Sequence, residues 1–444
     1  MNRLLAAVLA LAAAVPAAAA TYTVGPGRPH ASLQALFAAV TLRPGDVVEV
    51  DGGTTYAGGA VLRQSGTATA PIVLRGLRVG GQRPVLSGGA NTLELRLSNH
   101  VVIEGFEITG GSARCLFVNA AEIVLRDLLV RDCTGQGILS SDQDSGSITL
   151  EYSEVRNAGG GDGRHALYIQ TDEVAYPGAV FRMRYNYVHD GLGGNLLKSR
   201  AERNEIHYNW FENAYYHEIE LIGPDQFTQQ AGWSVGLARE DSEVLGNVIV
   251  HAGSFGAIMR LGGDGTGESR GRYRIVNNTI VATGSASSYT VFRLFDGLES
   301  VEAHNNVLHR TTSGTLRVER AVEAVWSQGR RVAGSNNWVD LGATELPSEW
   351  IDTRQGGAPG FVSVQALDLR PAPDSPLSQA GNAAPVSPAA WPFPGPTPLP
   401  LSLPPIRQAP LPGGAVARPP ETPPTIGALT GSRPDPVFVS GFDG

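Results

Sequence analysis

One short phrase recurs along most of this chain and restricts the folds that the chain can adopt. Between residues 98 and 309 the pattern apolar-x-x-Asn-x-apolar, or a variant of it, occurs eight times. Repeats about 20 to 50 residues apart are typical of a solenoid in which each repeat is one supersecondary unit. The eight copies begin at Ile103, Leu125, Leu150, Met183, Ile206, Val244, Ile275 and Ala303, and their fourth positions are Phe106, Leu128, Ser153, Asn186, Asn209, Asn247, Asn278 and Asn306.

The five asparagines predict a stacked column of side chains. Amide groups that lie one strand apart can hydrogen-bond along the stack, so asparagine is favoured at a turn that is repeated in fixed register. A second short strand follows each phrase, for example at residues 166–170, 195–199 and 218–221. Short strands without hairpin turns predict an all-β fold, a right-handed parallel β-helix. A propeller would need regular hairpins and a leucine-rich repeat its own consensus, so both are disfavoured.

The two ends of the chain differ from the repeated part. Residues 1–20 combine an early arginine, a short apolar stretch and a run of alanine, which predicts a secretory signal peptide. Residues 21–76 predict an N-terminal cap, with a short helix capped by Ser32, and the first strands, and residues 77–372 predict the coils of the β-helix. Residues 373–436 are rich in proline and predict an extended linker, followed by a short aromatic tail at residues 437–444.

Composition limits the partners and the compartment of the protein. The formal net charge is −8, and 55 glycines with 30 prolines favour turns over long helices. This acidic balance argues against nucleic acid as a partner, and no stretch after the signal peptide is long and apolar enough to span a membrane. We therefore expect a secreted monomer, located in the periplasm, outside the cell or at the cell surface. Cys115 and Cys133 either form a disulfide or are buried as small apolar residues.

Lysine occurs once in this sequence, at position 198, although lysine and arginine together number 34. Lysine can lose its proton near neutral pH and arginine cannot, so a single retained lysine indicates a catalytic base. Because side chains alternate between the faces of a strand, alignment of the second strands on their inward apolar residues gives one outward column. The predicted column consists of Ser140, Gln170, Lys198, Glu220, Arg260 and Arg293.

Further candidate residues surround this predicted column. The repeats beside it are the longest, and extra loops on one side of a solenoid usually build a binding groove. Tyr215, Tyr216 and Trp233 are candidates for stacking on sugar rings, and Gln170 and Arg293 are candidates for substrate binding. His165 and His217 begin two of the strands; we expect His165 to contact substrate and His217 to carry a proton.

The central strands resemble a known group of enzymes. The resemblance rests on Asn-Leu-Leu-Lys-Ser at residues 195–199, Asn-Glu-Ile-x-x-Asn-x-Phe at 204–211 and His-Glu-Ile-Glu-Leu at 217–221. These motifs are similar to the central coils of secreted proteins of the pectin-lyase-like superfamily, and more narrowly to polysaccharide lyase family 6, which includes alginate lyases and chondroitinase B. The resemblance implies Ca²⁺-assisted β-elimination of an acidic, uronate-containing polysaccharide with Lys198 as the base. The strand expected to carry the acid has no arginine, so Arg200, Arg260 or His217 would have to replace it.

Calcium is the cofactor that this resemblance implies, and Glu218 and Glu220 are the candidate ligands because carboxylate oxygens suit Ca²⁺. Without the ion, Glu220 would favour the charged form of Lys198 and a salt bridge. Three functions therefore remain open from the sequence. The first is a polysaccharide lyase, which we favour. The alternatives are a surface glycan-binding protein without turnover and a glycoside hydrolase, which would need at least two carboxylates around one bond.

Overall fold

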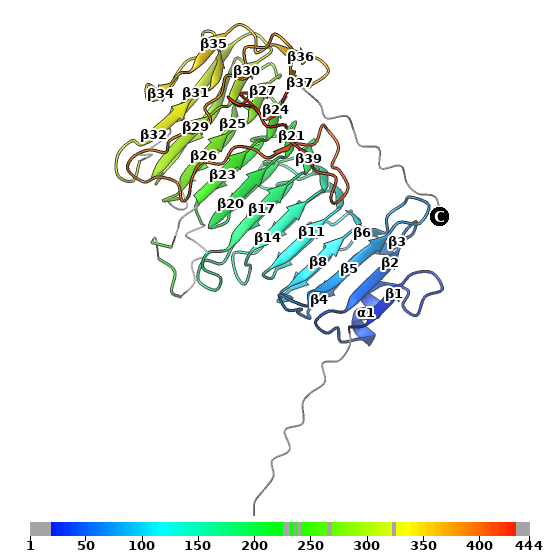
Figure 1. Ribbon diagram of the computed structural model, residues 1–444. Coiled ribbons are helices and arrows are strands. Elements are labelled where there is room, and N and C mark those ends of the chain that lie inside the picture. The colour runs from blue at the N-terminus through cyan, green and yellow to red at the C-terminus, as the bar shows by residue number, and fades with distance from the viewer. Residues whose placement is uncertain are drawn as a thin grey trace, which may run out of the picture.

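The computed structural model describes residues 19–224, 231–234, 236–237, 241–263, 269–321 and 326–431. Within these residues the chain coils repeatedly, and each coil adds one strand to each of three long parallel sheets that enclose a common core (Figure 1). This arrangement confirms the parallel β-helix predicted from the sequence. It is nearly all-β, with a single short helix among the described residues.

The three sheets contain thirteen, twelve and ten strands and are named here by those numbers. The thirteen-stranded sheet contains, in spatial order, β1 (Thr21–Val24), β2 (Val47–Asp51), β5 (Ile72–Leu77), β8 (Val101–Glu104), β11 (Ile123–Arg126), β14 (Ile148–Glu151), β17 (Val180–Arg184), β20 (Arg203–His207), β23 (Asp241–Leu245), β26 (Arg272–Val276), β29 (Ser300–His304), β32 (Val332–Ser335) and β34 (Trp350–Ile351). The twelve-stranded sheet contains β3 (Thr55–Ala57), β6 (Val85–Ser87), β9 (Glu107–Thr109), β12 (Leu129–Cys133), β15 (Glu154–Ala158), β18 (Tyr187–His189), β21 (Trp210–Glu212), β24 (Val248–His251), β27 (Thr279–Ala282), β30 (Val307–Arg310), β33 (Trp338–Asp340) and β35 (Arg354–Gly356). The ten-stranded sheet contains β4 (Ala60–Leu62), β7 (Asn91–Arg96), β10 (Arg114–Asn119), β13 (Gln136–Ser140), β16 (Leu167–Gln170), β19 (Leu197–Arg200), β22 (Ile219–Ile222), β25 (Ala257–Gly262), β28 (Ser288–Leu294) and β31 (Thr315–Ala321).

The core is filled by the inward residue of each strand. Along β2, for example, Val48 and Val50 are fully buried, whereas Val47, Glu49 and Asp51 are not, which is the two-residue period of a strand with one buried face. Equivalent residues of successive coils stack, and one apolar cluster extends from Val24 to Val339. Each fully buried Val, Leu or Ile contributes about 1.5–3 kcal/mol, so the stacked core accounts for the stability of the coil.

The predicted asparagine column is present as a continuous ladder. The backbone N–H of Asn186 donates to Oδ1 of Asn209 at 3.0 Å, and the same bond repeats from each asparagine to the next at 2.8–2.9 Å. The ladder has one more member than the sequence predicted, Asn337. Its side chains are fully buried, and each Nδ2 donates to backbone carbonyls, so no part of the ladder amides is left unpaired.

The coil begins and ends at other residues than the sequence predicted. The short helix α1 (Leu33–Ala39) is present, and the Ser32 hydroxyl accepts a hydrogen bond from the N–H of Ala35 as expected of an N-cap. However, β1 and β2 already pair in parallel, so the strands expected within residues 21–76 belong to the coil, and coiling starts before residue 77. After β35 the chain leaves the coil, because β36 (Phe361–Ser363) and β37 (Asp368–Pro371) pair with each other in antiparallel orientation. No helix of the described part is long and apolar enough to cross a membrane.

The proline-rich segment is not the extended linker that the sequence predicted. Over residues 373–431, including the short pair β38 (Ser402–Leu403) and β39 (Val416–Ala417), it returns along the solenoid and covers the outer face of the twelve-stranded sheet. In Figure 1 this orange-to-red segment lies over β21, β24 and β27. Leu377, Ile426 and Leu429 are buried there against Trp210, Trp338 and their neighbours. We call residues 373–431 the C-terminal strap.

Hydrogen bonds to side chains of the coil explain how this proline-rich strap can pack against the solenoid. Proline has no N–H to satisfy, and the carbonyls of the strap accept hydrogen bonds from side chains of the coil. Asn277 donates to the carbonyls of Thr425 and Gly427 at 2.9 and 3.2 Å. Arg274, 1% exposed, donates to the carbonyls of Gly395 and Pro396 at 3.1 and 3.0 Å. Such contacts depend on tertiary structure, so composition alone does not reveal them.

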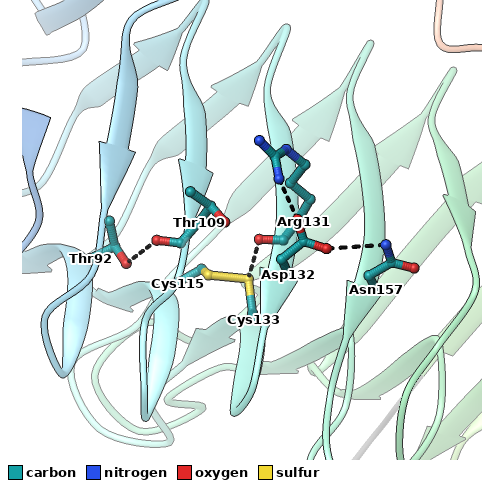
Figure 2. The surroundings of a disulfide bond; sticks show 7 residues. All are labelled: Thr92, Thr109, Cys115, Arg131, Asp132, Cys133 and Asn157. Carbon is teal, nitrogen blue, oxygen red and sulfur yellow. Dashed lines mark hydrogen bonds and ion pairs between the residues drawn. A yellow bond between two sulfur atoms is a disulfide. The ribbon is translucent and has the colours of Figure 1, made fainter. Parts of the chain in front are cut away.

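The two cysteines form a disulfide, which settles the alternative left open by the sequence (Figure 2). Cys115 on β10 and Cys133 on β12 are both fully buried, and their Cα atoms are 5.8 Å apart. The bond therefore joins the ten-stranded sheet to the twelve-stranded sheet inside the core. The coil corner around it is held further by a hydrogen bond from Asn157 to Asp132 (3.1 Å).

Candidate active site

Lys198 lies near the middle of the ten-stranded sheet, on β19, with its side chain on the outer face. Its register partners are Tyr168 on β16 and Glu220 on β22. Adjacent strands are about 4.8 Å apart, so partners in register present their side chains to one another. Beyond Glu220 the same register position is occupied by arginine on three successive strands. We call the set Tyr168, Lys198, Glu220, Arg260, Arg293 and Arg320 the outward row.

Two members of the predicted column do not belong to this row. On β13 the residue in register with Tyr168 is Leu139, not Ser140. On β16 the row contains Tyr168, whereas Gln170 lies two residues further along the strand and pairs with Arg200. Ser140 points inward, is fully buried and donates to the carbonyl of Gln170 at 2.8 Å. The prediction for Ser140 failed because the apolar Leu139 faces outward and the polar Ser140 faces inward, whereas a strand with one buried face normally has its apolar residues inward. Gln170 instead lines a cavity of about 340 Å³ together with Leu139 and Tyr168.

Tyr168 is a site residue that the sequence analysis missed. The Nζ of Lys198 lies 5.1 Å from the centre of its ring, a cation–π contact. Arg200 Nε donates to the Tyr168 hydroxyl at 3.1 Å, and Arg200 Nη1 donates to the carbonyl of Gly223. Arg200 is only 3% exposed. Because Arg200 is buried against Tyr168, we assign it a positioning role in place of the role as replacement acid that was considered from the sequence.

Glu220 and Arg260 form an ion pair in the centre of the outward row. Glu220 Oε1 lies 3.0 Å from Arg260 Nη1, and Oε2 accepts a hydrogen bond from Nδ2 of Asn195. The Arg260 guanidinium also lies 3.9 Å from the Phe295 ring centre. The carboxylate next to Lys198 thus already has an arginine partner, and Arg260 already has a carboxylate partner.

Arg293 differs from Arg260 because no described residue gives it a carboxylate or any other hydrogen-bond partner. Its guanidinium lies 5.0 Å from the ring centre of Phe295 and 5.8 Å from that of Phe255. Burial, and then the charges of Arg260 and Arg320, lower its pKa. A half-buried cation in this setting is suited to an anionic group of a ligand. One strand further, Arg320 lines a cavity of about 780 Å³.

Asn195 connects the row to two histidines. Its backbone N–H donates to Nδ1 of His165 at 2.9 Å, and its Oδ1 accepts from the N–H and from Nδ1 of His217, both at 3.1 Å. Its Nδ2 donates to Glu220. Each polar atom of this buried asparagine therefore has a defined partner, and the sequence analysis did not single out Asn195 as a site residue.

The two histidines are held as neutral side chains. Burial, followed by the charges of Lys198 and Arg200, lowers the pKa of His165 to about 3. Because its Nδ1 accepts a hydrogen bond, its proton must be on Nε2. Burial, followed by Arg293 and Arg260, lowers the pKa of His217 well below its usual value. Neither histidine supplies a proton from an imidazolium at neutral pH, so the predicted role of His217 as replacement acid is not supported.

Glu218 and Glu220 do not form the shared calcium site that the sequence predicted. Glu218 is fully buried, and its two oxygens lie 2.7 and 2.9 Å from Nδ1 of His251. The oxygens of Glu220 are directed at Arg260 and Asn195. The described residues contain no group of three His, Cys, Asp or Glu side chains arranged to hold a metal ion. Because the carboxylate oxygens of Glu218 and Glu220 are already held by these partners, the two residues do not fit a Ca²⁺ ion.

Of the aromatic residues predicted for sugar stacking, Tyr215 and Tyr216 lie beside the outward row, next to Phe255. Tyr215 is 46% exposed, and its ring centre lies 4.9 Å from that of Tyr216, which in turn lies 4.8 Å from Phe255. The neighbouring Asp162 raises the pKa of Tyr216 to about 12, so its hydroxyl stays protonated. Trp233 is half-buried in a short described segment, and no described contact connects it to the row.

The sequence and the structure were compared with known proteins. No family model matches the sequence, and no curated protein matches it. Among solved structures the chain is similar to pectate lyase Pel9A, with 14% identity and a TM-score of 0.49 over 84% of this chain and 95% of that one. It is also similar to the PL6 family polysaccharide lyase Pedsa3628 from Pseudopedobacter saltans, with 12% identity and a TM-score of 0.44 over 76% of this chain and 91% of that one. A GH136 lacto-N-biosidase from Eubacterium ramulus is similar with 12% identity and a TM-score of 0.43 over 72% of this chain and 67% of that one.

Proposed function

We propose that this protein is a secreted polysaccharide lyase that cleaves a uronate-containing polysaccharide by β-elimination, with Lys198 as the base. The observation that carries the proposal is the outward row, which presents the one lysine of the sequence on a rigid sheet with Arg293 and Arg320 on nearby strands. A base and a carboxylate-binding cation on one face are the two groups that this elimination needs most.

The reaction assigns a role to each of these groups. Arg293 lies three strands beyond Lys198, about 14 Å along the row, so it binds the carboxylate of a neighbouring uronate and holds the polymer in register. Neutral Lys198 takes the proton on C5 of the reacting uronate, the electrons of the C5–H bond form the C4–C5 double bond, and the C4–O bond breaks toward the leaving oxygen. That oxygen must gain a proton, and we assign its delivery to the hydroxyl of Tyr168, which Arg200 holds in place.

Two cavities lie on opposite sides of Lys198 along the outward row. The cavity lined by Leu139, Tyr168 and Gln170 lies toward β13, and the cavity lined by Arg317 and Arg320 lies at β31. The glycan would therefore run along the solenoid axis and cross the strands of the ten-stranded sheet. The exposed Tyr215 is placed to stack on a sugar at the edge of the row.

Secretion follows from the same proposal. A polymeric glycan is met outside the cytoplasm, and a buried disulfide such as Cys115–Cys133 forms and persists in oxidising compartments. The predicted signal peptide at residues 1–20 lies mostly outside the described residues. N-terminal sequencing of the protein after export from its native cell would test that prediction.

The second candidate, a glycan-binding protein without turnover, is favoured by one observation. Glu220 is the register partner of Lys198, and a nearby carboxylate stabilises the charged ammonium that cannot act as a base. Binding would then use the same cations but produce no bond cleavage.

One assay separates the two. The protein is incubated with alginate, pectate and glycosaminoglycans, with and without Ca²⁺, and the absorbance of the unsaturated product is followed. A lyase gives increasing absorbance with at least one polymer, and Lys198→Arg abolishes it because arginine keeps the charge but cannot accept the proton. Binding of a polymer without any absorbance change would support the binding protein instead.

A further inference from the structure

The cavity beside Tyr168 contains two arginines that the proposed mechanism does not use. Its volume is about 340 Å³, and its described lining residues include Arg114 and Arg164 but no aspartate or glutamate. Sites that bind small ligands in proteins have volumes of about 300–1,000 Å³. Three of the lining residues, Ser112, Ala113 and Arg164, are exposed, so the cavity is open to solvent and a ligand can enter it.

The guanidinium of Arg114 lies on the line of the outward row. Phe117 on β10 is in register with Leu139, and Leu139 is in register with Tyr168, so Phe117 continues that line by two strands. The Arg114 guanidinium lies 4.5 Å from the centre of the Phe117 ring, a cation–π contact. Because β10 is three strands from β19, this cation is about 14 Å from Lys198 along the solenoid.

Arg114 forms no ion pair with a carboxylate of the described residues. Its Nη1 donates to Oδ1 of Asn91 at 3.3 Å, a long hydrogen bond to a neutral group. The carboxylate at the same register position one strand further is Glu94, which pairs with Arg96 instead. Arg114 therefore keeps a positive charge, and the hydrogen atoms of its Nη2 can be donated to a ligand.

Gln136 holds the loop that carries Arg164. Its Nε2 donates to the carbonyl of Gly163 at 3.0 Å, and its Oε1 accepts from the N–H of His165. Arg164 itself donates from Nη1 to a backbone carbonyl at 3.1 Å, and it has no ion pair with a carboxylate in the described part of the chain. Because Gln136 is also the register partner of Arg114, both cations are placed before any ligand binds.

The cavity at β31 offers a different environment. Its lining includes Arg320 and Arg330 but also Glu319 and Glu345, and Arg330 forms an ion pair with Glu319. Acidic side chains thus offset the cations of that cavity, whereas the described lining of the cavity beside Tyr168 contains cations alone. The cavity beside Tyr168 is therefore the more suitable place for a second anionic group of a ligand.

We propose that Arg114 and Arg164 bind a carboxylate of the glycan on the side of the cleaved bond that keeps the leaving oxygen. Tyr168 is assigned to protonate that oxygen and also lines this cavity, so the departing sugars would lie toward β13 and β10. Arg293 is three strands from Lys198 in the opposite direction. The two sites together would select a polymer with acidic sugars on both sides of the cleaved bond. This inference rests on the proposed function because it takes the ligand to be the uronate polymer.

Binding of defined oligosaccharides to arginine variants tests the inference. All proteins are the full chain with Lys198→Arg, so that no cleavage occurs. Arg114→Gln and Arg164→Gln each remove a charge and keep a polar side chain. Arg63→Gln is the control, because Arg63 is exposed, directly follows β4 of the same sheet and lines neither cavity. The probes are the hexasaccharides of galacturonate, of mannuronate and of hyaluronan, each measured at 50 and 200 mM NaCl.

We expect Arg114→Gln and Arg164→Gln each to weaken binding of the hexasaccharide that binds best by about 3- to 10-fold at the lower salt concentration. The dependence of the dissociation constant on salt should also become weaker, because one charged contact is lost. Arg63→Gln should change neither quantity. A purely structural role of the two arginines would not alter the salt dependence.

The outcomes separate this inference from the proposed function. Unchanged affinity and salt dependence in both cavity variants would overturn the inference, while cleavage of a uronate polymer by the wild type would still support the lyase. Weaker binding in the cavity variants of a protein whose wild type cleaves none of the polymers would refute the lyase and support the anion site. If none of the three hexasaccharides binds the parent, both fail.

Chemical modification of arginine provides a second test that does not depend on folding of a cavity variant. Phenylglyoxal should modify the exposed Arg164 and Arg63 of the Lys198→Arg protein, as measured by mass spectrometry of its peptides. A saturating amount of the hexasaccharide that binds best should protect Arg164 and leave Arg63 reactive. Equal modification of Arg164 with and without the hexasaccharide would contradict the proposal.

Discussion

The Nζ of Lys198 lies 5.1 Å from the centre of the Tyr168 ring, its register partner on the adjacent strand, and Arg200 donates to the hydroxyl of that ring from beneath. Lys198, Tyr168 and Arg200 come from two neighbouring strands and form one unit on the same outer face of the ten-stranded sheet. The proposed chemistry depends on this unit, and it provides the first prediction.

Substitution of Lys198 should abolish turnover without loss of the fold. Lys198→Arg and Lys198→Ala should each lower kcat by at least about 100-fold on the polymer that the wild type cleaves, because general-base catalysis contributes at least that factor. Lys198→Arg should retain binding. Arg63→Ala, at an exposed position of the N-terminal coils, is the control and should be unaffected. Unchanged kcat in Lys198→Arg would refute the base assignment.

Removal of Arg293 or Arg320, neither of which has a carboxylate partner among the described residues, should affect binding more than chemistry. Arg293→Ala and Arg320→Ala should each raise KM by roughly 5- to 20-fold, since a charge-assisted hydrogen bond contributes about 1.5–3 kcal/mol before solvent screening. The dependence of KM on salt concentration should become weaker in both. Steady-state kinetics at 50 and 200 mM NaCl measure this, and an unchanged salt dependence would count against the proposed anion site.

The buried pair of Glu218 and His251 should make stability depend on pH. Burial alone would lower the pKa of His251, but the Glu218 carboxylate and the carbonyl of Phe255 outweigh it and raise that pKa. The stabilisation is therefore fully present below about pH 6.5, the ordinary value for histidine, and is lost as pH rises through the higher value in the folded state. Glu218→Gln should lower the free energy of unfolding by about 3 kcal/mol at pH 6 and by less at pH 9. Urea unfolding at both pH values measures the difference, and an equal loss at both would contradict the assignment.

The disulfide should contribute measurably to stability. Cys115 and Cys133 are 18 residues apart, and closing a loop of that size stabilises a protein by about 3 kcal/mol. The double variant Cys115→Ala/Cys133→Ala should unfold at lower urea concentration than the wild type. Dithiothreitol should weaken the wild type and leave the double variant unchanged. If reduction does not shift the wild-type midpoint, the two sheets do not depend on this bond.

The C-terminal strap should be needed for stability of the coil. A chain that ends at residue 372 would expose the side of the twelve-stranded sheet that buries Trp210 and Trp338. Each large apolar side chain lost from this contact costs about 1.5–3 kcal/mol, so we expect a much lower midpoint of thermal unfolding and red-shifted tryptophan fluorescence. Arg407→Ala, which removes only the exposed pair with Glu212, is the control and should change stability by less than about 1 kcal/mol.

The sequence predicted the fold because its strongest signal is local. A buried asparagine amide must be hydrogen-bonded, and at a repeated turn the next asparagine of the ladder provides the partner. The spacing of the asparagines in the sequence therefore indicates the length of each coil. Asn337 escaped recognition because the residue three positions before it is Gly334, where an apolar residue was expected. The structure explains the glycine, since a Cβ there would meet the ring of Trp350.

The site was less predictable because it depends on register and on long-range contacts. Lys198, Glu220, Arg260 and Arg293 were aligned correctly, since apolar residues flank them in a regular pattern. Tyr168 was missed because Leu139 faces outward and disturbs the alignment one strand earlier. Nothing in the spacing shows that the buried Glu218 would meet His251 across 33 residues of sequence.

The direction of the asparagine ladder limits how the molecule can change in length. In every step the amide oxygen faces the preceding coil, and the series ends at Ser153, whose N–H donates to Asn186 and whose hydroxyl accepts from Leu128. A hydroxyl can serve as such a terminus because it both donates and accepts. A coil duplicated between two asparagines would meet matching groups above and below, whereas a partial coil would break the series. The solenoid can therefore lengthen or shorten by whole turns during evolution, or by design, while both ends remain as they are.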